Sequence, residues 1–210
     1  MDLFHDVIQF FVRGGLFMAP LWLASLISLS VLLERALAIR RAHIINPKLV
    51  EAIENLRYGQ APTEIESLAD DRTVLARLVR TALRNVTWPK SENAETLQTK
   101  ARTEISRLER GLVILEIAVG VGPLLGLLGT VSGLIKIFGN VGDQQIATQG
   151  VAIARGISEA LNTTVFGLVV AIPALISFSI FSRRVESFAV ELEGYCNELL
   201  AKLYSEPEAK

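Results

Sequence analysis

The chain has 210 residues, of which 50% are hydrophobic and 20% are charged, and its formal net charge is −1. This charge balance excludes a strongly basic surface, so no nucleic-acid partner is expected. The single cysteine, Cys196, excludes an internal disulfide framework. The sequence has no phosphate-binding loop and no His/Cys metal spacing, so we expect neither an enzyme nor a cofactor or metal site.

Residues 1–13 begin the chain with a weak amphipathic pattern, in which Leu and Phe alternate with Asp and Gln. This pattern is typical of a helix that lies on the membrane surface, here the outer leaflet. A small-residue cleavage site does not follow, so the segment is not predicted to be a secretory signal peptide.

Three stretches of the chain lack charged residues: Gly14–Leu33, Ile117–Ile135 and Ala160–Ser182. The second spans about 28 Å as a helix, close to the ~30 Å of a bilayer hydrocarbon core. The other two are of similar length. The sequence therefore predicts an all-α integral membrane protein with three transmembrane helices.

Lysine and arginine positions predict the orientation of these spans. Fourteen of the 21 basic residues lie between the first two spans, and Arg183 and Arg184 follow the third. Basic residues near span ends favour the cytoplasmic side. We therefore expect an N-terminus outside, in the periplasm, and a large loop and C-terminus in the cytoplasm of a multi-pass protein of the bacterial inner membrane.

Local signals predict helices in the cytoplasmic parts. Proline, glycine and acidic residues place two short helices near Pro47–Leu56 and Thr63–Val86. No proline follows Ser91 until Pro123, and Ser91–Phe138 is predicted as one continuous helix that Gly111 weakens slightly. Span three is expected to continue to Leu203. The extensions of the second and third spans would form a long cytoplasmic helical stalk.

The predicted organisation has seven parts. They are an external amphipathic segment (1–13), transmembrane helix 1 (14–34), a cytoplasmic helical region (35–111), transmembrane helix 2 (112–138), an external loop (139–150), transmembrane helix 3 (151–182), and a cytoplasmic C-terminal helix and tail (183–210).

Small residues form a stripe on each of the second and third spans, at spacings of three and four. Such stripes let helix backbones approach closely in lipid. Three spans of one chain do not suffice to bury both stripes, so the sequence predicts a closed homo-oligomeric ring. The helix-packing residues are Gly122, Gly126, Gly129 and Gly133 on one helix, and Gly156, Ala160, Gly167 and Ala171 on the other.

Three polar residues of these spans are candidates for a pore or proton pathway: Thr130, Thr164 and Glu159. Buried polar groups in a membrane are costly and are commonly functional. Each also has a structural explanation. A threonine in a membrane helix often bonds to its own i−4 carbonyl, and Glu159 could form an ion pair with Arg155 one turn earlier.

Two segments carry a family resemblance, GPLLGLLGTVSGLIKIF at 122–138 and ARGISEALNTTVFGLVVAIPAL at 154–175. They resemble the signature of the ExbB/TolQ/MotA proton-channel family, most closely its ExbB and TolQ branches. The three-span topology and the large inner loop agree with this resemblance. Asn162 and Thr163 replace a commoner apolar pair, which makes the segment more polar than the family pattern, and Glu116 also departs from it.

The resemblance implies a pentameric ring whose second and third spans line a central pore. Thr130, Glu159 and Thr164 match the family's pore threonine, glutamate and second threonine. The pore would hold the single transmembrane helices of two copies of an ExbD- or TolR-like partner, whose aspartate carries the proton. A TonB-like or TolA-like protein and surrounding lipid are further expected partners.

We therefore expect a proton-channel or motor subunit that couples proton motive force to ExbB-like import across the outer membrane. A TolQ-like envelope-maintenance motor remains open as an alternative within the family. A non-conducting membrane scaffold, which uses the glycine stripes only for packing, is the alternative outside it.

Overall fold

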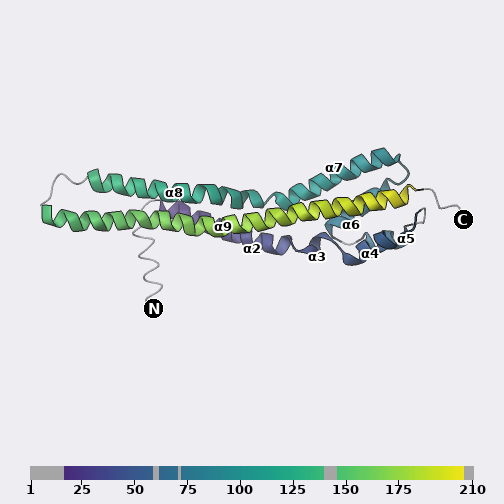
Figure 1. Cartoon of the computed structure of the whole chain (residues 1–210), viewed down its shortest axis with the longest axis horizontal. Coiled ribbons are helices and arrows are strands. Elements are labelled where there is room, and N and C mark those ends of the chain that lie inside the picture. The colour runs from purple at the N-terminus through teal and green to yellow at the C-terminus, as the bar shows by residue number, and fades with distance from the viewer. Residues whose placement is uncertain (1–16, 59–61, 71, 140–145, 206–210) are drawn as a thin grey trace. The chain divides into compact units, whose positions relative to one another are not determined.

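The computed structural model describes residues 17–58, 62–70, 72–139 and 146–205. In these ranges the chain forms helices and no strand (Figure 1). The helices are α2 (Met18–Ala38), α3 (Arg41–Ile44), α4 (Pro47–Asn55), α5 (Thr63–Leu68), α6 (Val74–Arg84), α7 (Lys90–Glu109), α8 (Leu112–Gly139) and α9 (Ile146–Leu203).

The helices belong to two compact units, which are described separately. The first unit comprises Met1–Glu34 and Leu112–Ser179, and the second comprises Arg35–Gly111 and Ile180–Lys210. The amphipathic segment predicted at 1–13 lies outside the described residues, as do residues 140–145 of the loop predicted at 139–150. The last five residues of that predicted loop belong to helix α9, which begins at Ile146.

Three helical stretches are long and apolar enough to cross a membrane: Met18–Ala38, Leu112–Gly139 and Ile153–Leu203. An all-helical protein with three candidate membrane-spanning helices is therefore confirmed. The third helix, α9, is continuous over 58 residues, so the predicted extension of span three to Leu203 is also confirmed. The large apolar content of these segments, rather than any cap, explains why they are helical in lipid.

The prediction of one continuous helix over Ser91–Phe138 is wrong, because the helix is interrupted at Arg110 and Gly111. In a continuous helix the Leu108 carbonyl would accept a hydrogen bond from the Leu112 N–H. Here Arg35 Nη1 donates to the Leu108 carbonyl at 3.3 Å. A Cβ at Gly111 would overlap the distal part of the Arg35 side chain, so a larger residue here would require that side chain to move.

The single helix predicted near Thr63–Val86 is also wrong, since two helices, α5 and α6, cover this range. Thr73 begins α6 as its N-cap and accepts a hydrogen bond from the Ala76 N–H at 3.3 Å. Arg80 Nε donates to the Ala69 carbonyl at 3.2 Å, at the end of α5. These interactions satisfy backbone groups at the break. The helix predicted near Pro47–Leu56 is confirmed as α4.

The second unit has a core of large aliphatic side chains. Fully buried members are Leu75, Leu78 and Val79 of α6 and Leu199 of α9. Burial of such side chains contributes roughly 1.5–3 kcal/mol each in water. The core therefore has the composition of a water-soluble helical domain.

Two polar contacts attach the end of α9 to the second unit. Lys202 Nζ donates to the Ile53 and Glu54 carbonyls at 2.8 and 2.7 Å, at the C-terminal end of α4. A cation at this end of a helix satisfies free carbonyls and complements the helix dipole. Cys196 of α9 is buried, and burial raises the pKa of its thiol to about 12. It acts as a small apolar side chain.

Candidate functional site

Helices α8 and α9 lie side by side and antiparallel in the first unit, and glycines bring their backbones together (Figure 1). A Cβ at Gly167 would lie 2.6 Å from the Gly122 carbonyl oxygen and 3.2 Å from Gly126 Cα. A Cβ at Gly126 would lie 2.9 Å from the Thr163 carbonyl oxygen and 2.9 Å from Thr164 Cα. Backbone atoms cannot move aside as a side chain can, so these positions require glycine at this helix spacing.

The same contact continues along both helices towards Gly133. A Cβ at Gly129 would lie 2.6 Å from Thr163 Oγ1, and one at Gly133 would lie 2.8 Å from Ala160 Cβ. As the residue number increases along α8, the number of the facing residue on α9 decreases. This order is that of an antiparallel helix pair.

The two ends of the stripes differ in what they contact. A Cβ at Gly122 would lie 3.1 Å from the Gly167 carbonyl oxygen and 3.5 Å from Ala171 Cβ. A Cβ at Gly156 would lie 2.6 Å from Ile137 Cδ1, the far end of a flexible side chain. The closest backbone approach is that of Gly167 to Gly122, where a Cβ at Gly167 would lie 2.6 Å from the carbonyl oxygen, so the two backbones meet over Gly122 and Gly126 of α8.

The structure corrects the argument from these stripes to a ring. The sequence predicts that one chain cannot bury both stripes, but in the structure the stripe of α8 packs against that of α9 in the same chain. They satisfy each other because the helices are antiparallel and the small residues of one fall opposite those of the other. The stripes therefore carry no requirement for a second copy.

Three threonine hydroxyls meet in the middle of this contact. Thr130 Oγ1 lies 3.3 Å from the Gly126 carbonyl oxygen and 3.0 Å from that of Ala160. Thr164 Oγ1 lies 3.1 Å from the Gly126 oxygen and is hydrogen-bonded to Thr130 Oγ1. Thr163 Oγ1 lies 3.2 Å from the Gly126 oxygen and 2.7 Å from that of Ala160. We call these three hydroxyls and two carbonyls the hydroxyl cluster.

The hydroxyl cluster has more acceptors than donors. Each hydroxyl carries one hydrogen and two lone pairs, so it can donate to only one neighbour at a time. The Gly126 oxygen lies within reach of all three hydroxyls. Rotation of a hydroxyl can therefore exchange one hydrogen bond for another without leaving a donor unsatisfied, which would be costly in an apolar surrounding. Such a cluster can rearrange its hydrogen bonds and can form a hydrogen bond with a further polar group.

The structural alternative for Thr130, a hydrogen bond to its own i−4 carbonyl, is observed, but this bond does not account for all the contacts of its hydroxyl. Its hydroxyl reaches Gly126 on its own helix and also reaches Ala160 on α9. Thr164 reaches across to Gly126 on α8. The predicted pair of threonines is thus brought together by the fold.

Thr163 is a member of the cluster that the sequence analysis did not choose. Its hydroxyl is buried, with 1% of the residue exposed. The signal was available, because Thr163 lies three residues after Ala160 and four before Gly167, on the small-residue stripe itself. In the sequence, the polarity of Thr163 indicates only a departure from the family pattern.

Glu159 is not joined to the hydroxyl cluster. Its Oε1 lies 3.3 Å from Arg155 Nε, an i,i+4 ion pair, and its side chain is 35% exposed. None of the hydrogen bonds of the cluster given above involves it. The geometry agrees with the structural explanation for Glu159, whereas a role in proton movement is a proposal. Over the described ranges, no group of three His, Cys, Asp or Glu side chains could hold a metal ion.

Comparison with known proteins gives a family for this arrangement. Residues 70–194, more than half of the chain, match the model of the MotA/TolQ/ExbB proton channel family. The chain belongs to this family. The matched range includes all of α8, the hydroxyl cluster and most of α9.

Individual relatives carry ExbB and TolQ names. The chain is 36% identical over 192 residues to the biopolymer transport protein ExbB-like 1 of Synechocystis sp., which covers 85% of this chain and 73% of the relative. It is 30% identical over 204 residues to ExbB-like 3 of the same organism, covering 95% and 97%. It is 34% identical over 111 residues to the Tol-Pal system protein TolQ of Pseudomonas aeruginosa, covering 53% and 48%. Membership and the three apolar helices make this chain a multi-pass membrane protein of a family of channel and transport subunits.

Proposed function

We propose that this chain is the ring-forming subunit of a proton channel and motor in the bacterial inner membrane. It couples proton motive force, with an ExbD/TolR-like partner, to ExbB-like import across the outer membrane. The observation that carries this proposal is the hydroxyl cluster. It places Thr130 and Thr164 together in the middle of two apolar helices, in a chain of a proton-channel family.

The proton carrier in this proposal belongs to the partner. The predicted spans 14–34, 112–138 and 151–182 contain no aspartate. Threonine hydroxyls do not take up a net charge at physiological pH, so they can stabilise a carrier but not replace it. Glu116 and Glu159 lie in the predicted spans but take no part in the hydrogen bonds of the hydroxyl cluster. A carboxylate on a single-span partner helix, brought next to Thr130 and Thr164, supplies the titratable group that the cluster lacks. This explains why the cluster is polar without being charged.

A ring of copies of this chain, five-fold in keeping with the family resemblance, surrounds that partner. Large apolar side chains are exposed on both helices of the first unit, including Leu124 (64%) and Ile135 (67%) of α8 and Val169 (57%) of α9. The small-residue stripes are already used within the chain, so these large side chains supply the contacts between copies and with lipid. In this proposal the N-terminus is periplasmic and the C-terminus cytoplasmic, as the distribution of basic residues favours.

Two other functions remain as alternatives. TolQ-like envelope maintenance, with a TolA-like protein in place of a TonB-like one, would use the same channel, and the likeness to a TolQ protein favours it. A non-conducting scaffold would use the glycine contacts for packing alone. The scaffold predicts that the hydroxyls of Thr130 and Thr164 are dispensable.

The experiment replaces both hydroxyls by methyl groups in Thr130→Val/Thr164→Val. Valine keeps the shape of threonine, so the ring should still assemble, as native mass spectrometry would report. Activity that depends on proton motive force, measured in cells that carry the partner gene, should fall by at least roughly tenfold, the effect expected when a hydrogen bond to the partner's charged carboxylate is lost. Full activity of this variant would overturn the proposal in favour of the scaffold.

Glu159→Gln is the comparison variant in the same assay. Glu159 is ion-paired with Arg155 outside the hydroxyl cluster, so its loss should reduce activity only in part. Replacement of the partner's membrane carboxylate should abolish activity. If Glu159→Gln were inactive while the partner carboxylate were dispensable, the carrier would lie in this chain and the assignment would be reversed.

A further inference from the structure

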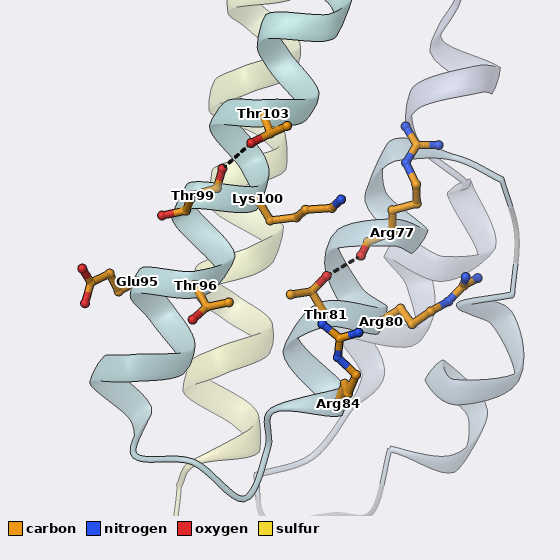
Figure 2. A pocket seen from close by; sticks show the side chains of 9 residues that line it. All are labelled: Arg77, Arg80, Thr81, Arg84, Glu95, Thr96, Thr99, Lys100 and Thr103. Carbon is orange, nitrogen blue, oxygen red and sulfur yellow. Dashed lines mark hydrogen bonds between the residues drawn. The ribbon is translucent and has the colours of Figure 1, made fainter.

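A basic groove lies between α6 and α7 in the second unit (Figure 2). Its volume is about 650 Å³, within the range of small-molecule sites. Of its nine lining residues, four are cationic, four are threonines and one, Glu95, is acidic. The Glu95 side chain points away from α6 in Figure 2. The wall of the groove is thus dominated by positive charge and hydroxyl groups.

One buried carboxylate, that of Glu104, neutralises only part of the positive charge at the groove. Glu104 is 1% exposed and forms ion pairs with Arg77 at 2.7 Å, Lys100 at 3.3 Å and Arg107 at 3.2 Å. One carboxylate thus serves three cations, and positive charge is left over. Burial alone would raise the pKa of Glu104, but hydrogen bonds and charges from Arg77 and Lys100 lower it. Glu104 therefore stays ionised and holds Arg77 and Lys100 in place.

Arg84 adds a charge that no described acidic residue compensates. It is exposed on the last turn of α6 and makes no ion pair with any residue in the described ranges. Figure 2 shows its guanidinium folded back along α6 towards Thr81, and the Lys100 side chain reaching from α7 towards α6. Arg80, by contrast, is bound to the Ala69 carbonyl and points away from α7 in this view.

Hydroxyl groups complete the wall on the α7 side. Thr96 lies one turn before Lys100, on the same face of α7, whereas Thr99 points away from α6 on the side of Glu95 (Figure 2). An arginine fork, an ammonium group and hydroxyls match the oxygens of a phosphate group, to which arginine can donate two parallel hydrogen bonds. A neutral or cationic ligand would leave the repulsion between the cations uncompensated.

We propose that this groove binds a phosphate-bearing anion, held by Arg84 and Lys100 with a hydroxyl contact from Thr96. The phosphate comes from a soluble phosphorylated compound or from an anionic lipid headgroup, which present the same oxygens. The site is separate from the hydroxyl cluster and does not depend on the proposed proton channel. Occupation would stabilise the contact between α6 and α7.

The test uses the full-length protein in nanodiscs of zwitterionic phosphatidylcholine and inorganic tripolyphosphate as the probe. Isothermal titration calorimetry should detect one saturable site per chain. Arg84→Gln should weaken binding by at least about tenfold, as expected for the loss of a charge-assisted hydrogen bond. The matched control is Arg102→Gln, which removes the same charge from an exposed position of α7 outside this groove. It should change the affinity by less than about twofold.

A second pair of measurements distinguishes the source of the phosphate. Tripolyphosphate binding that persists in nanodiscs containing phosphatidylglycerol supports a soluble ligand. Loss of tripolyphosphate binding to the wild-type protein when phosphatidylglycerol is present supports a lipid headgroup, provided that Arg84→Gln does not show this competition. The proposal is overturned if wild-type protein shows no saturable binding and no competition, or if Arg84→Gln and Arg102→Gln weaken binding equally.

Arg84→Lys keeps the proposal testable if Arg84→Gln lowers the melting temperature. This variant keeps the charge and loses the planar fork, so binding should be intermediate between wild type and Arg84→Gln. Wild-type affinity in Arg84→Lys would exclude a bidentate contact from Arg84 and contradict the proposed geometry.

Discussion

The two units of this chain hold helices together by different means. In the first unit, α8 and α9 meet through glycine backbones, as at Gly122 and Gly167, and through threonine hydroxyls. In the second unit, the contacts are made by large side chains such as Leu78 and Leu199, and a buried carboxylate, Glu104, is surrounded by cations.

The difference follows from the solvent around each unit. In water, burial of leucine is favourable because it removes apolar surface from water. In lipid, leucine gains little by moving from lipid to protein, so close backbone approach and interhelical hydrogen bonds contribute relatively more. The same chain therefore places small residues at contacts in its apolar part and large ones at contacts in its charged part. Substitutions should affect the two units in opposite ways: added volume should harm the first, and lost charge or volume should harm the second.

The largest effect is expected from Gly167→Ala in the first unit. Its new Cβ would lie 2.6 Å from the Gly122 carbonyl oxygen, so α8 and α9 would have to separate. Overpacking of this kind costs about 1–3 kcal/mol and sometimes more. A lowered melting temperature of the detergent-purified protein would report it. Gly120→Ala is the control, because nothing lies within 4 Å of a Cβ at Gly120. It should be neutral or stabilising by up to roughly 1 kcal/mol, and equal destabilisation by both variants would contradict the packing argument.

A smaller, pH-dependent effect is expected from Glu104→Gln in the second unit. Despite burial, Arg77 and Lys100 lower the pKa of Glu104 below its reference value of 4.5. A carboxylate with a lowered folded-state pKa stabilises the fold above the unfolded-state value, and this contribution is lost as pH falls through the lowered pKa. Wild type should therefore lose more stability than Glu104→Gln between roughly pH 5 and pH 3.

At neutral pH, Glu104→Gln should be destabilised by about 1–2 kcal/mol, because its cations keep hydrogen bonds but lose a charge partner. Melting temperatures measured across this pH range would test both statements. Glu95→Gln, at an exposed position of the same helix, is the control and should follow wild type. Parallel pH curves for wild type and Glu104→Gln would exclude the proposed stabilisation.

The smallest effect is expected from Thr163→Val, which removes one hydroxyl from the first unit. Gly126 and Ala160 keep other donors in Thr164 and Thr130, so the loss should be about 0.5–1 kcal/mol. Thr103→Val is matched to it, since Thr103 Oγ1 bonds only to Thr99 of its own turn at 3.0 Å and is exposed. That control should change stability by less than about 0.5 kcal/mol. A Thr163→Val protein as stable as the control would indicate that its interhelical bond contributes nothing.

Much of the fold could be predicted because it depends on neighbouring residues. Uncharged stretches of membrane length predicted the three apolar helices, and an uninterrupted pattern predicted the continuation of α9 to Leu203. Spacings of three and four predicted which residues share a helix face, as for the glycines Gly122, Gly126, Gly129 and Gly133 of α8. Helix formation and helix periodicity are local properties, so the sequence determined them by itself.

Only the tertiary structure decided which of these faces meet. At the break near Gly111, Arg35 binds the Leu108 carbonyl and packs on Gly111, although Arg35 and Gly111 are 76 positions apart in the chain. The α8 stripe packs against α9 of the same chain, and Thr163 turns its hydroxyl into that contact. The compensation of Glu104 by Arg77 likewise joins two helices. Each of these contacts depends on how helices dock after they form, and docking depends on shape and charge over the whole surface, which spacing within one helix does not contain.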